Sequence, residues 1–122
     1  MVYINSLLTH NGKIGKLGED LACGFLVSKG HEIIERNFKN KIGEIDIVTK
    51  LKNKIHIVEV KTSQSQNIRA EENMNAKKMR KVAKLGEIYA RNNLFCVDFV
   101  GVYLNSDLSL KNINYLENIE IF

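Results

Sequence analysis

Two short segments near the middle of the 122-residue chain carry acids in a spacing that suits metal-dependent chemistry. The first contains Glu44 and Asp46, the second contains Glu59 and Lys61, and one apolar residue separates the members of each pair. Residues two apart in a β-strand share a face, so each pair projects from one side of its strand. Carboxylate oxygens with retained waters are the usual ligands of Mg²⁺, and a nearby lysine can stabilise charge that develops on a phosphate. The spacing therefore indicates a site for Mg²⁺ or Mn²⁺.

A β-hairpin would bring the two segments together. The ranges Gly43–Lys50 and Lys54–Thr62 are rich in Ile and Val, and a short polar connection joins them. A loop of this length pairs Val48 with Ile57, and slipping one strand by a single residue would destroy that register. The cross-strand pairs that follow are Asp46 with Glu59 and Glu44 with Lys61. Two carboxylates directly opposite each other lie about 5 Å apart at Cβ and repel, which a bound cation would relieve.

The same charges also fit a simpler role. Amphipathic hairpins carry acids and lysines on a solvated face, and Glu44 with Lys61 could form an ordinary cross-strand ion pair. Against this interpretation, Val48 and Ile57 share the face of the acids, which makes both strands nearly continuously apolar, as central strands are. Charges in such surroundings are costly unless they are paired or bind a metal.

The rest of the chain supplies elements that can cover such a hairpin. Apolar residues at helical spacing predict two helices, Gly30 is a natural stop for the first, and two further strands end the chain. Beyond the hairpin, the predicted elements are a helix over Ile14–Lys29, a strand over His31–Phe38, a helix over Ala70–Asn92, and strands over Leu94–Leu104 and Asn114–Ile121. This order predicts an α/β protein in which helices flank a mixed central β-sheet, and the length predicts a single domain over residues 1–122.

Composition restricts the class of protein. The 44% hydrophobic and 26% charged residues exclude disorder as the overall state, and the net charge of +4 with a pI near 9.1 favours an anionic partner. Two cysteines are too few for a disulfide framework, and the cysteines and three histidines show no metal-ligand spacing. No apolar run approaches the roughly 18 residues of a membrane span, so we expect a soluble, cytoplasmic protein without a membrane partner.

The second predicted helix carries a cluster of positive charge. Its basic residues are Lys77, Lys78, Arg80, Lys81 and Lys84. Three of them fall at i, i+4 and i+7 and so form a stripe that faces away from the apolar side of the helix. A basic stripe binds phosphate backbones without base specificity, although such a stripe can equally be a solvated surface. We predict that Lys77, Lys78, Lys81 and Lys84 bind nucleic acid.

Glycines recur every third residue at Gly12, Gly15 and Gly18, with lysines between them. The order of residues is not that of a Walker phosphate-binding loop. We therefore expect these glycines to form a flexible start to the first helix, close to the sheet or to a bound backbone.

Several motifs together resemble a known family. The acids and the lysine of the hairpin resemble the core of PD-(D/E)XK nucleases, in which an Asp at the end of one strand precedes a Glu-x-Lys on the next. The further motifs, in chain order, are Gly18-Glu19, Arg36-Asn37, Gly43-Glu44-Ile45-Asp46, Val58-Glu59-Val60-Lys61-Thr62, a Lys-rich helix and Val97-Asp98-Phe99-Val100. Together they resemble the uncharacterised YraN-type bacterial family over nearly the whole chain, from about Gly15 to Ile121. The resemblance implies a restriction-endonuclease-like three-layer core.

The resemblance also implies roles for individual residues. Asp46 and Glu59 would be metal ligands, Lys61 the catalytic lysine, and Glu19 the helix acid that completes the metal site. Ile45 stands where the name of the nuclease core has a proline. Read from its position alone, Glu19 could instead be an acid at a helix N-terminus that interacts with the helix dipole.

These observations favour a Mg²⁺- or Mn²⁺-dependent nuclease, an endonuclease-like hydrolase that acts on DNA or RNA phosphodiesters. A non-catalytic nucleic-acid-binding module of the same fold is the first alternative, since a fold does not establish activity. A protein-interaction domain is the second. Because related nucleases often act as pairs, a homodimer is a further expectation.

Overall fold

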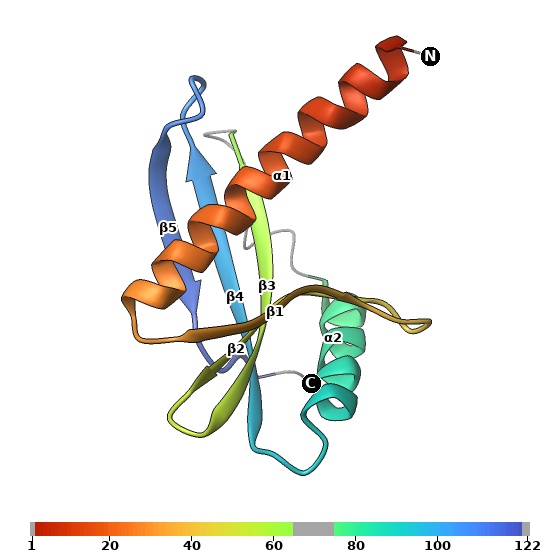
Figure 1. Cartoon of the computed structure of the whole chain (residues 1–122), viewed down its shortest axis with the longest axis vertical. Helices are drawn as coiled ribbons and strands as arrows, with labels where there is room; N and C mark the ends of the chain where they lie inside the picture. Colours follow the sequence, from red (N-terminus) through yellow and green to blue (C-terminus); the bar gives the residue numbers. More distant parts are fainter. Residues whose placement is uncertain (1, 65–74, 121–122) are drawn as a thin grey trace.

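Two helices cover opposite faces of a five-stranded sheet in the computed structural model (Figure 1), which describes residues 2–64 and 75–120 and gives only the backbone of residues 2–11. In chain order the elements are α1 (Val2–Ser28), β1 (Glu32–Lys39), β2 (Glu44–Leu51), β3 (Lys54–Ser63), α2 (Ala76–Ala90), β4 (Phe95–Leu104) and β5 (Leu110–Leu116). The prediction of an α/β protein with a three-layer core is therefore confirmed.

The strands lie in the sheet in the order in which they occur in the chain, β1-β2-β3-β4-β5. Strands β1, β2 and β3 pair antiparallel, β3 pairs parallel to β4, and β4 pairs antiparallel to β5. The mixed sheet expected from the sequence is thus present. The parallel pair needs a long crossover, which contains α2, and this crossover places α2 on the face opposite α1.

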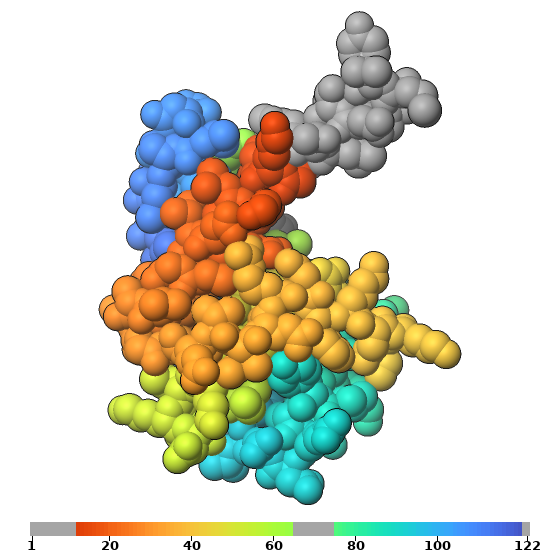
Figure 2. All heavy atoms as spheres, viewed as in Figure 1, coloured from red at the N-terminus to blue at the C-terminus, as the bar shows by residue number. Residues whose placement is uncertain are grey.

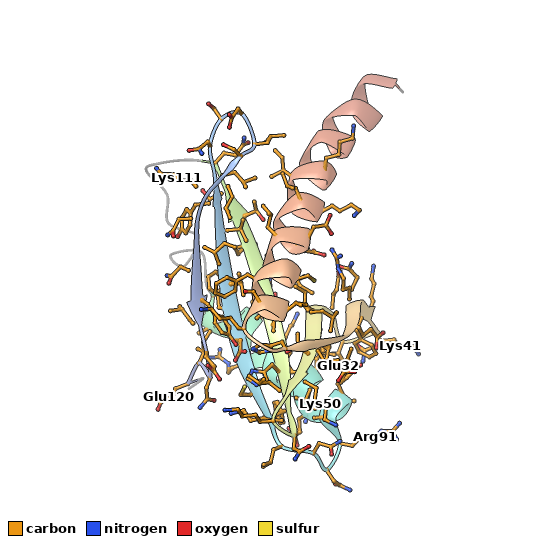
Figure 3. All side chains as sticks on the ribbon, turned by 60° about the vertical axis from the view of Figure 1, so that its left-hand side comes forward. Glu32, Lys41, Lys50, Arg91, Lys111 and Glu120 are labelled. Atoms are coloured by element: carbon orange, nitrogen blue, oxygen red, sulfur yellow. The ribbon has the colours of Figure 1, made fainter. Side chains whose placement is uncertain are left out.

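Each helix buries an apolar stripe against its own face of the sheet. On the α1 face, Ala22 and Leu26 pack against strand residues that include Val58 and Val100. On the α2 face, Val82 and a set of neighbouring apolar side chains pack against the sheet. That set consists of Met79 and Leu85 from α2 and Ile45, Val48, Ile57 and Val97 from the sheet. Charged side chains at strand ends and turns project into solvent, away from the apolar cores on the two faces of the sheet, as Lys41, Arg91 and Lys111 do in Figure 3.

The predicted hairpin register is confirmed where the strands pair. Val48 lies opposite Ile57, and Leu51 lies opposite Lys54. The two turn residues, Lys52 and Asn53, have φ angles of 50° and 64°. Two consecutive left-handed residues match the twist of a tight hairpin, so the turn itself fixes the register.

Helix α1 begins at Val2 and not near Ile14, which corrects two predictions. The three glycines lie within the helix, so they do not form a flexible start to it, and Glu19 lies far from the N-terminus of α1. The helix-dipole interpretation of Glu19 is therefore wrong. A Cβ at position 18 would lie 1.8 Å from the hydroxyl oxygen of Thr62, so Gly18 is the point at which α1 approaches β3 closely.

The alternation of faces along β2 breaks at Asp46, contrary to the sequence prediction. Regular alternation would place Ile45 and Ile47 on one face, but Ile45 packs on the α2 side and Ile47 on the α1 side. Strand β1 is irregular at the same level: Asn37 has a left-handed φ of 55° and lies between the two residues of β1 that pair with these isoleucines. Pairing between β2 and β3 stops at Ile47 and Val58. Neither predicted pair, Asp46 with Glu59 or Glu44 with Lys61, is part of the ladder.

Two smaller boundary predictions also change. Helix α2 starts at Ala76, and residues 70–74 of the predicted helix lie outside the described residues. Strand β5 covers Leu110–Leu116, earlier than predicted, and Ile121 lies outside the described residues. Across the described ranges, no helix is long and apolar enough to cross a membrane.

Candidate metal centre

The candidate site lies where β2 separates from β3. Beyond the last paired residues of the hairpin, the Asp46 carboxylate takes the place of a backbone partner: its Oδ2 accepts a hydrogen bond of 2.8 Å from the Val60 N–H. Glu59 precedes Val60 in β3, and its charge interacts directly with that of Asp46. The structure therefore brings the two predicted acids together, although by a local break in pairing and not by the regular register.

Glu59 is a buried acid with an unsatisfied oxygen. Its side chain belongs to the α2 face of β3 and is 6% exposed. Among the described residues, Oε1 of Glu59 finds no hydrogen-bond partner. Burial, and then the neighbouring Asp46 charge, raise the pKa of Glu59 from 4.5 to about 8, against the opposing effect of Lys78. A further positive charge next to this carboxyl would favour its ionised form.

The pKa of Asp46 is raised as well. Burial raises its pKa above the ordinary value, although the hydrogen bond from the Val60 N–H and the positive charge of Lys78 act in the opposite direction. Two adjacent carboxyls with raised pKa values fit a site in which a divalent cation balances their charge.

The third predicted acid approaches from the other helix. Glu19 is half-buried on α1, and burial followed by the Asp46 charge raises its pKa. Its Oε1 lies 3.6 Å from Nη2 of Arg36. The Asn37 amide nitrogen, in the orientation that satisfies its neighbours, donates to Oε1 of Glu19 at 3.2 Å and to Oε1 of Glu44 at 3.3 Å. Around the break in β2, the charge of Asp46 thus interacts with Glu19 on one side and with Glu59 on the other.

An open depression adjoins this acid cluster. Its volume is about 600 Å³, and it lies between α1 and β1 on the face shown in Figure 2, with α1 in red and orange. The lining residues are Gly12, Gly15, Lys16, Glu19, Arg36 and Asn37. Glu19 and Asn37 line the depression, so the Glu19 edge of the acid cluster faces solvent on the α1 side.

The lysine that contacts the acids is not the one that the resemblance indicates. Lys61 is half-buried in β3, opposite Gly101, and the described part of the chain shows no ion pair between Lys61 and the three acids. Instead, Nζ of Lys78 lies 3.6 Å from Oε2 of Glu59. The sequence placed Lys78 only among the nucleic-acid-binding residues. Its position four residues before the buried Val82 was the signal that it lies at the edge of the core-facing side of α2.

The other lysines of α2 lie as the helical spacing predicts. Lys77, Lys81 and Lys84 are exposed, while Met79 and Val82 between them are buried. The stripe is therefore free to meet solvent or an anionic partner. Its binding to nucleic acid stays a prediction.

A second polar cluster lies on the α1 face, away from the acids, and sequence spacing did not reveal it. His56 of β3 pairs in register with Cys96 of β4, and Asp98 follows on the same face. Their donor atoms all lie within 4.8 Å of one another, so these residues could hold a metal ion. The signal would have been three polar residues in the same phase on two apolar strands, which is informative only once those strands are known to be neighbours.

Hydrogen bonds account for this second cluster without a metal. Asp98 accepts from His56 Nδ1 at 2.6 Å, from the Cys96 thiol at 3.3 Å, from the Asn118 N–H at 2.9 Å and from the Tyr115 hydroxyl. Burial would raise the pKa of Asp98, but these bonds lower it below its ordinary value. Burial raises the pKa of Cys96 to about 12, so its thiol keeps its proton, whereas a metal ligand must be a thiolate. The cluster is satisfied as a buried hydrogen-bond network.

Comparisons with known proteins identify a family over most of the chain. The model of the family described as "Uncharacterised protein family UPF0102" matches residues 18–102, a range that contains both lysines and all three acids discussed above. A UPF0102 protein of Caldanaerobacter subterraneus subsp. tengcongensis is 38% identical over 112 residues, which cover 86% of this chain and 92% of that protein. A UPF0102 protein of Campylobacter lari is 40% identical over 105 residues, covering 83% of this chain and 93% of that protein. One from Caldicellulosiruptor saccharolyticus is 36% identical over 112 residues, covering 87% and 95%.

Proposed function

This chain belongs to the UPF0102 family, and we propose that it is a divalent-metal-dependent nuclease that hydrolyses phosphodiester bonds of DNA or RNA. The description of the family names no activity, so the proposal depends on the site. The three-layer core is compatible with the restriction-endonuclease-like fold that the sequence motifs imply.

One observation carries the proposal. Within residues 2–64 and 75–120, the buried Oε1 of Glu59 has no hydrogen-bond partner, and it lies beside a second, half-buried acid, Asp46. An unsatisfied buried carboxylate oxygen costs free energy, and native proteins keep such atoms mainly where function requires them. Two or three carboxylates around an incompletely satisfied oxygen have the donor chemistry of a Mg²⁺ or Mn²⁺ site. The residues present therefore fit the metal.

In this proposal Asp46 and Glu59 hold the cation, and Glu19 faces them from α1. When bound, Mg²⁺ or Mn²⁺ would lower the pKa of a coordinated water and stabilise negative charge on the phosphate. In net terms one water is consumed: its oxygen forms a new bond to phosphorus and the bond to the leaving sugar oxygen breaks. One product ends in a phosphate monoester and the other in a hydroxyl, which takes the second proton.

In this proposal the lysines form two groups, one near the acids and one along the exposed face of α2. Lys61 and Lys78 belong to the elements that carry Glu59 or contact it, so they can act on the scissile phosphate or its neighbours. The exposed Lys77, Lys81 and Lys84 extend the positive surface along α2 and would hold the phosphate backbone. This division predicts weak sequence preference, because phosphate contacts carry no base information.

A non-catalytic nucleic-acid-binding module is the second candidate. The ion pair between Lys78 and Glu59 favours it, since a resident ammonium could by itself balance part of the buried charge. In that case the basic surface of α2 would bind nucleic acid while the acids bind no metal.

Metal-dependent stabilisation separates the two candidates. We expect Mn²⁺ or Mg²⁺ to raise the melting temperature of the wild-type protein relative to EDTA, and Asp46→Asn to abolish the increase. At a metal concentration near a hundred dissociation constants, the wild type should gain about 2.7 kcal/mol of stability. Without metal, Asp46→Asn should be at least as stable as the wild type, because it removes one of two repelling carboxyls.

The matched control is Asp107→Asn, which makes the same chemical change at an exposed residue between β4 and β5. It should respond to metal as the wild type does. Equal stabilisation of wild type and Asp46→Asn would remove the hairpin acids as the metal site, and cleavage of labelled linear and branched DNA and RNA would then have to be absent or metal-independent.

A further inference from the structure

Lys78 is held at the acid cluster by the start of α2. The side chain of Asn75 caps the helix, accepting from the backbone N–H groups of Lys77 at 2.8 Å and of Lys78 at 3.3 Å. This cap fixes the first turn beside β3, and Nζ of Lys78 reaches to 3.6 Å from Oε2 of Glu59. The carboxyl end of this pair is buried, but the Lys78 side chain is 50% exposed. One partner of the ion pair is thus fixed and the other has solvent to move into.

We propose that Lys78 is a displaceable stand-in for the metal: its ammonium contacts Glu59 in the metal-free protein and moves to the substrate phosphate when the acids bind a divalent cation. The inference rests on the proposed function and assigns a catalytic lysine to the site, in addition to Lys61. It follows from charge balance. Lys78 contacts Oε2 of Glu59, and a divalent cation at the neighbouring Oε1 would add two positive charges close to that ammonium. The two cations would repel each other, which weakens the contact of Lys78 with Glu59.

The ammonium that is released has an obvious destination. A lysine side chain is a flexible stem with three rotatable donors, which suits contact with a phosphate oxygen as a point charge. Lys78 lies on the same helix as the exposed lysines that would hold the phosphate backbone, and it is the one whose amino group reaches the acids. A phosphodiester bound along α2 would therefore pass next to the amino group that metal binding sets free.

The two states of Lys78 differ in chemical reactivity, which gives a readout independent of cleavage. An ion-paired ammonium reacts slowly with formaldehyde in reductive methylation, and release from the pair exposes it. We expect Mg²⁺ to increase the methylation rate at Lys78 roughly two- to fivefold, the range that a half-exposed ion pair can account for. The neighbouring exposed Lys77 is an internal control and should not change. Residue-level mass spectrometry resolves the two positions.

Variants then connect the movement to the reaction. In Asp46→Asn, Mg²⁺ should leave the reactivity of Lys78 unchanged, because the metal site is lost. Lys78→Ala should lower the cleavage rate at saturating substrate by about tenfold or more, the effect expected for one preorganised charge at the reacting phosphate. Lys78→Arg should restore part of the rate. Lys111→Ala, at an exposed residue of β5 outside the proposed binding surface, should leave that rate unchanged.

The outcomes separate the inference from the function on which it rests. If calorimetry shows Mg²⁺ binding that depends on Asp46 while the reactivity of Lys78 stays constant, the stand-in role is wrong and the metal site stands. If calorimetry shows no binding that depends on Asp46, both proposals are wrong. A metal-induced increase at Lys78 alone, with slow cleavage by Lys78→Ala, supports the inference.

Discussion

Replacing Glu59 by glutamine should remove most of the pH dependence of folding stability in the metal-free protein. The pKa of Glu59 is raised to about 8 in the folded chain, against an ordinary value of 4.5. Between these two values the folded state keeps a proton that the unfolded state releases. Stability is therefore greatest at acidic pH, falls as pH rises from 4.5 to about 8, and becomes constant above that window.

The size of the effect follows from the same two values. A pKa that moves from 4.5 to about 8 corresponds to roughly 5 kcal/mol, at about 1.4 kcal/mol for each factor of ten in proton affinity. This is an upper limit, because the side chain and its surroundings can relax when the charge forms. For a chain of this length, 1 kcal/mol is about 4 °C in melting temperature. About 4 kcal/mol of this effect lies between pH 5 and pH 9, so the wild type should melt up to about 15 °C lower at pH 9 than at pH 5.

Glutamine keeps the shape of the side chain and cannot ionise. Glu59→Gln should retain only the smaller slopes that Asp46 and Glu19 contribute, because burial raises the pKa of these two groups as well. Thermal melts in EDTA at half-unit intervals from pH 5 to pH 9 measure both curves. The control is Glu32→Gln, the same change at an exposed residue on β1 that is labelled in Figure 3. Parallel curves for Glu59→Gln and the wild type would show that Glu59 ionises without cost, and the argument for a strained acid pair would fail.

Two further predictions concern the elements that position the site. Gly18→Ala places a Cβ 1.8 Å from a hydroxyl oxygen of β3 and should destabilise the protein by about 1–3 kcal/mol. Gly24→Ala, with no atom within 4 Å, should stabilise it by up to about 1 kcal/mol through helix propensity. Urea denaturation measures both free energies of unfolding, and equal effects would contradict the close approach of α1 to the sheet. Lys81→Ala and Lys84→Ala should each lower the salt slope of oligonucleotide binding by about 0.7–0.9 for a lost phosphate contact, and an unchanged slope in fluorescence titrations would mean that the exposed face of α2 only solubilises the protein.

Short-range patterns were sufficient for the elements and for the register of the hairpin. The apolar runs of β2 and β3 and the short polar turn at Lys52 and Asn53 determine which residues face each other, because a tight turn leaves no freedom to slip. The apolar spacing of α2 likewise determined its buried side, including Met79 and Val82. The same patterns and the family resemblance selected the two acids, but they did not predict how the acids meet, because Asp46 and Glu59 lie beyond the end of the β2–β3 ladder.

The start of α1 could not be read from the sequence. Glycines at positions 12, 15 and 18 each lower helix propensity, so the pattern favoured a flexible start, yet the helix is continuous from Val2. At Gly18 the missing side chain is a packing requirement set by Thr62, a residue 44 positions away. Helix propensity depends only on residues that are near in the sequence, so it cannot predict a contact between residues 44 positions apart.

The decisive features of the site are also long-range. The break in side-chain alternation at Asp46 coincides with the irregular backbone of the neighbouring strand at Asn37. The ion pair between Lys78 and Glu59 exists because the crossover packs α2 against β3. The network of His56 and Asp98 needs β3 and β4 to be neighbours. The sequence by itself determined which residues could do chemistry, since residue type and strand or helix period are local. Which of them meet was decided only by the docking of the elements, because burial and charge pairing depend on atoms that the chain brings together from distant positions.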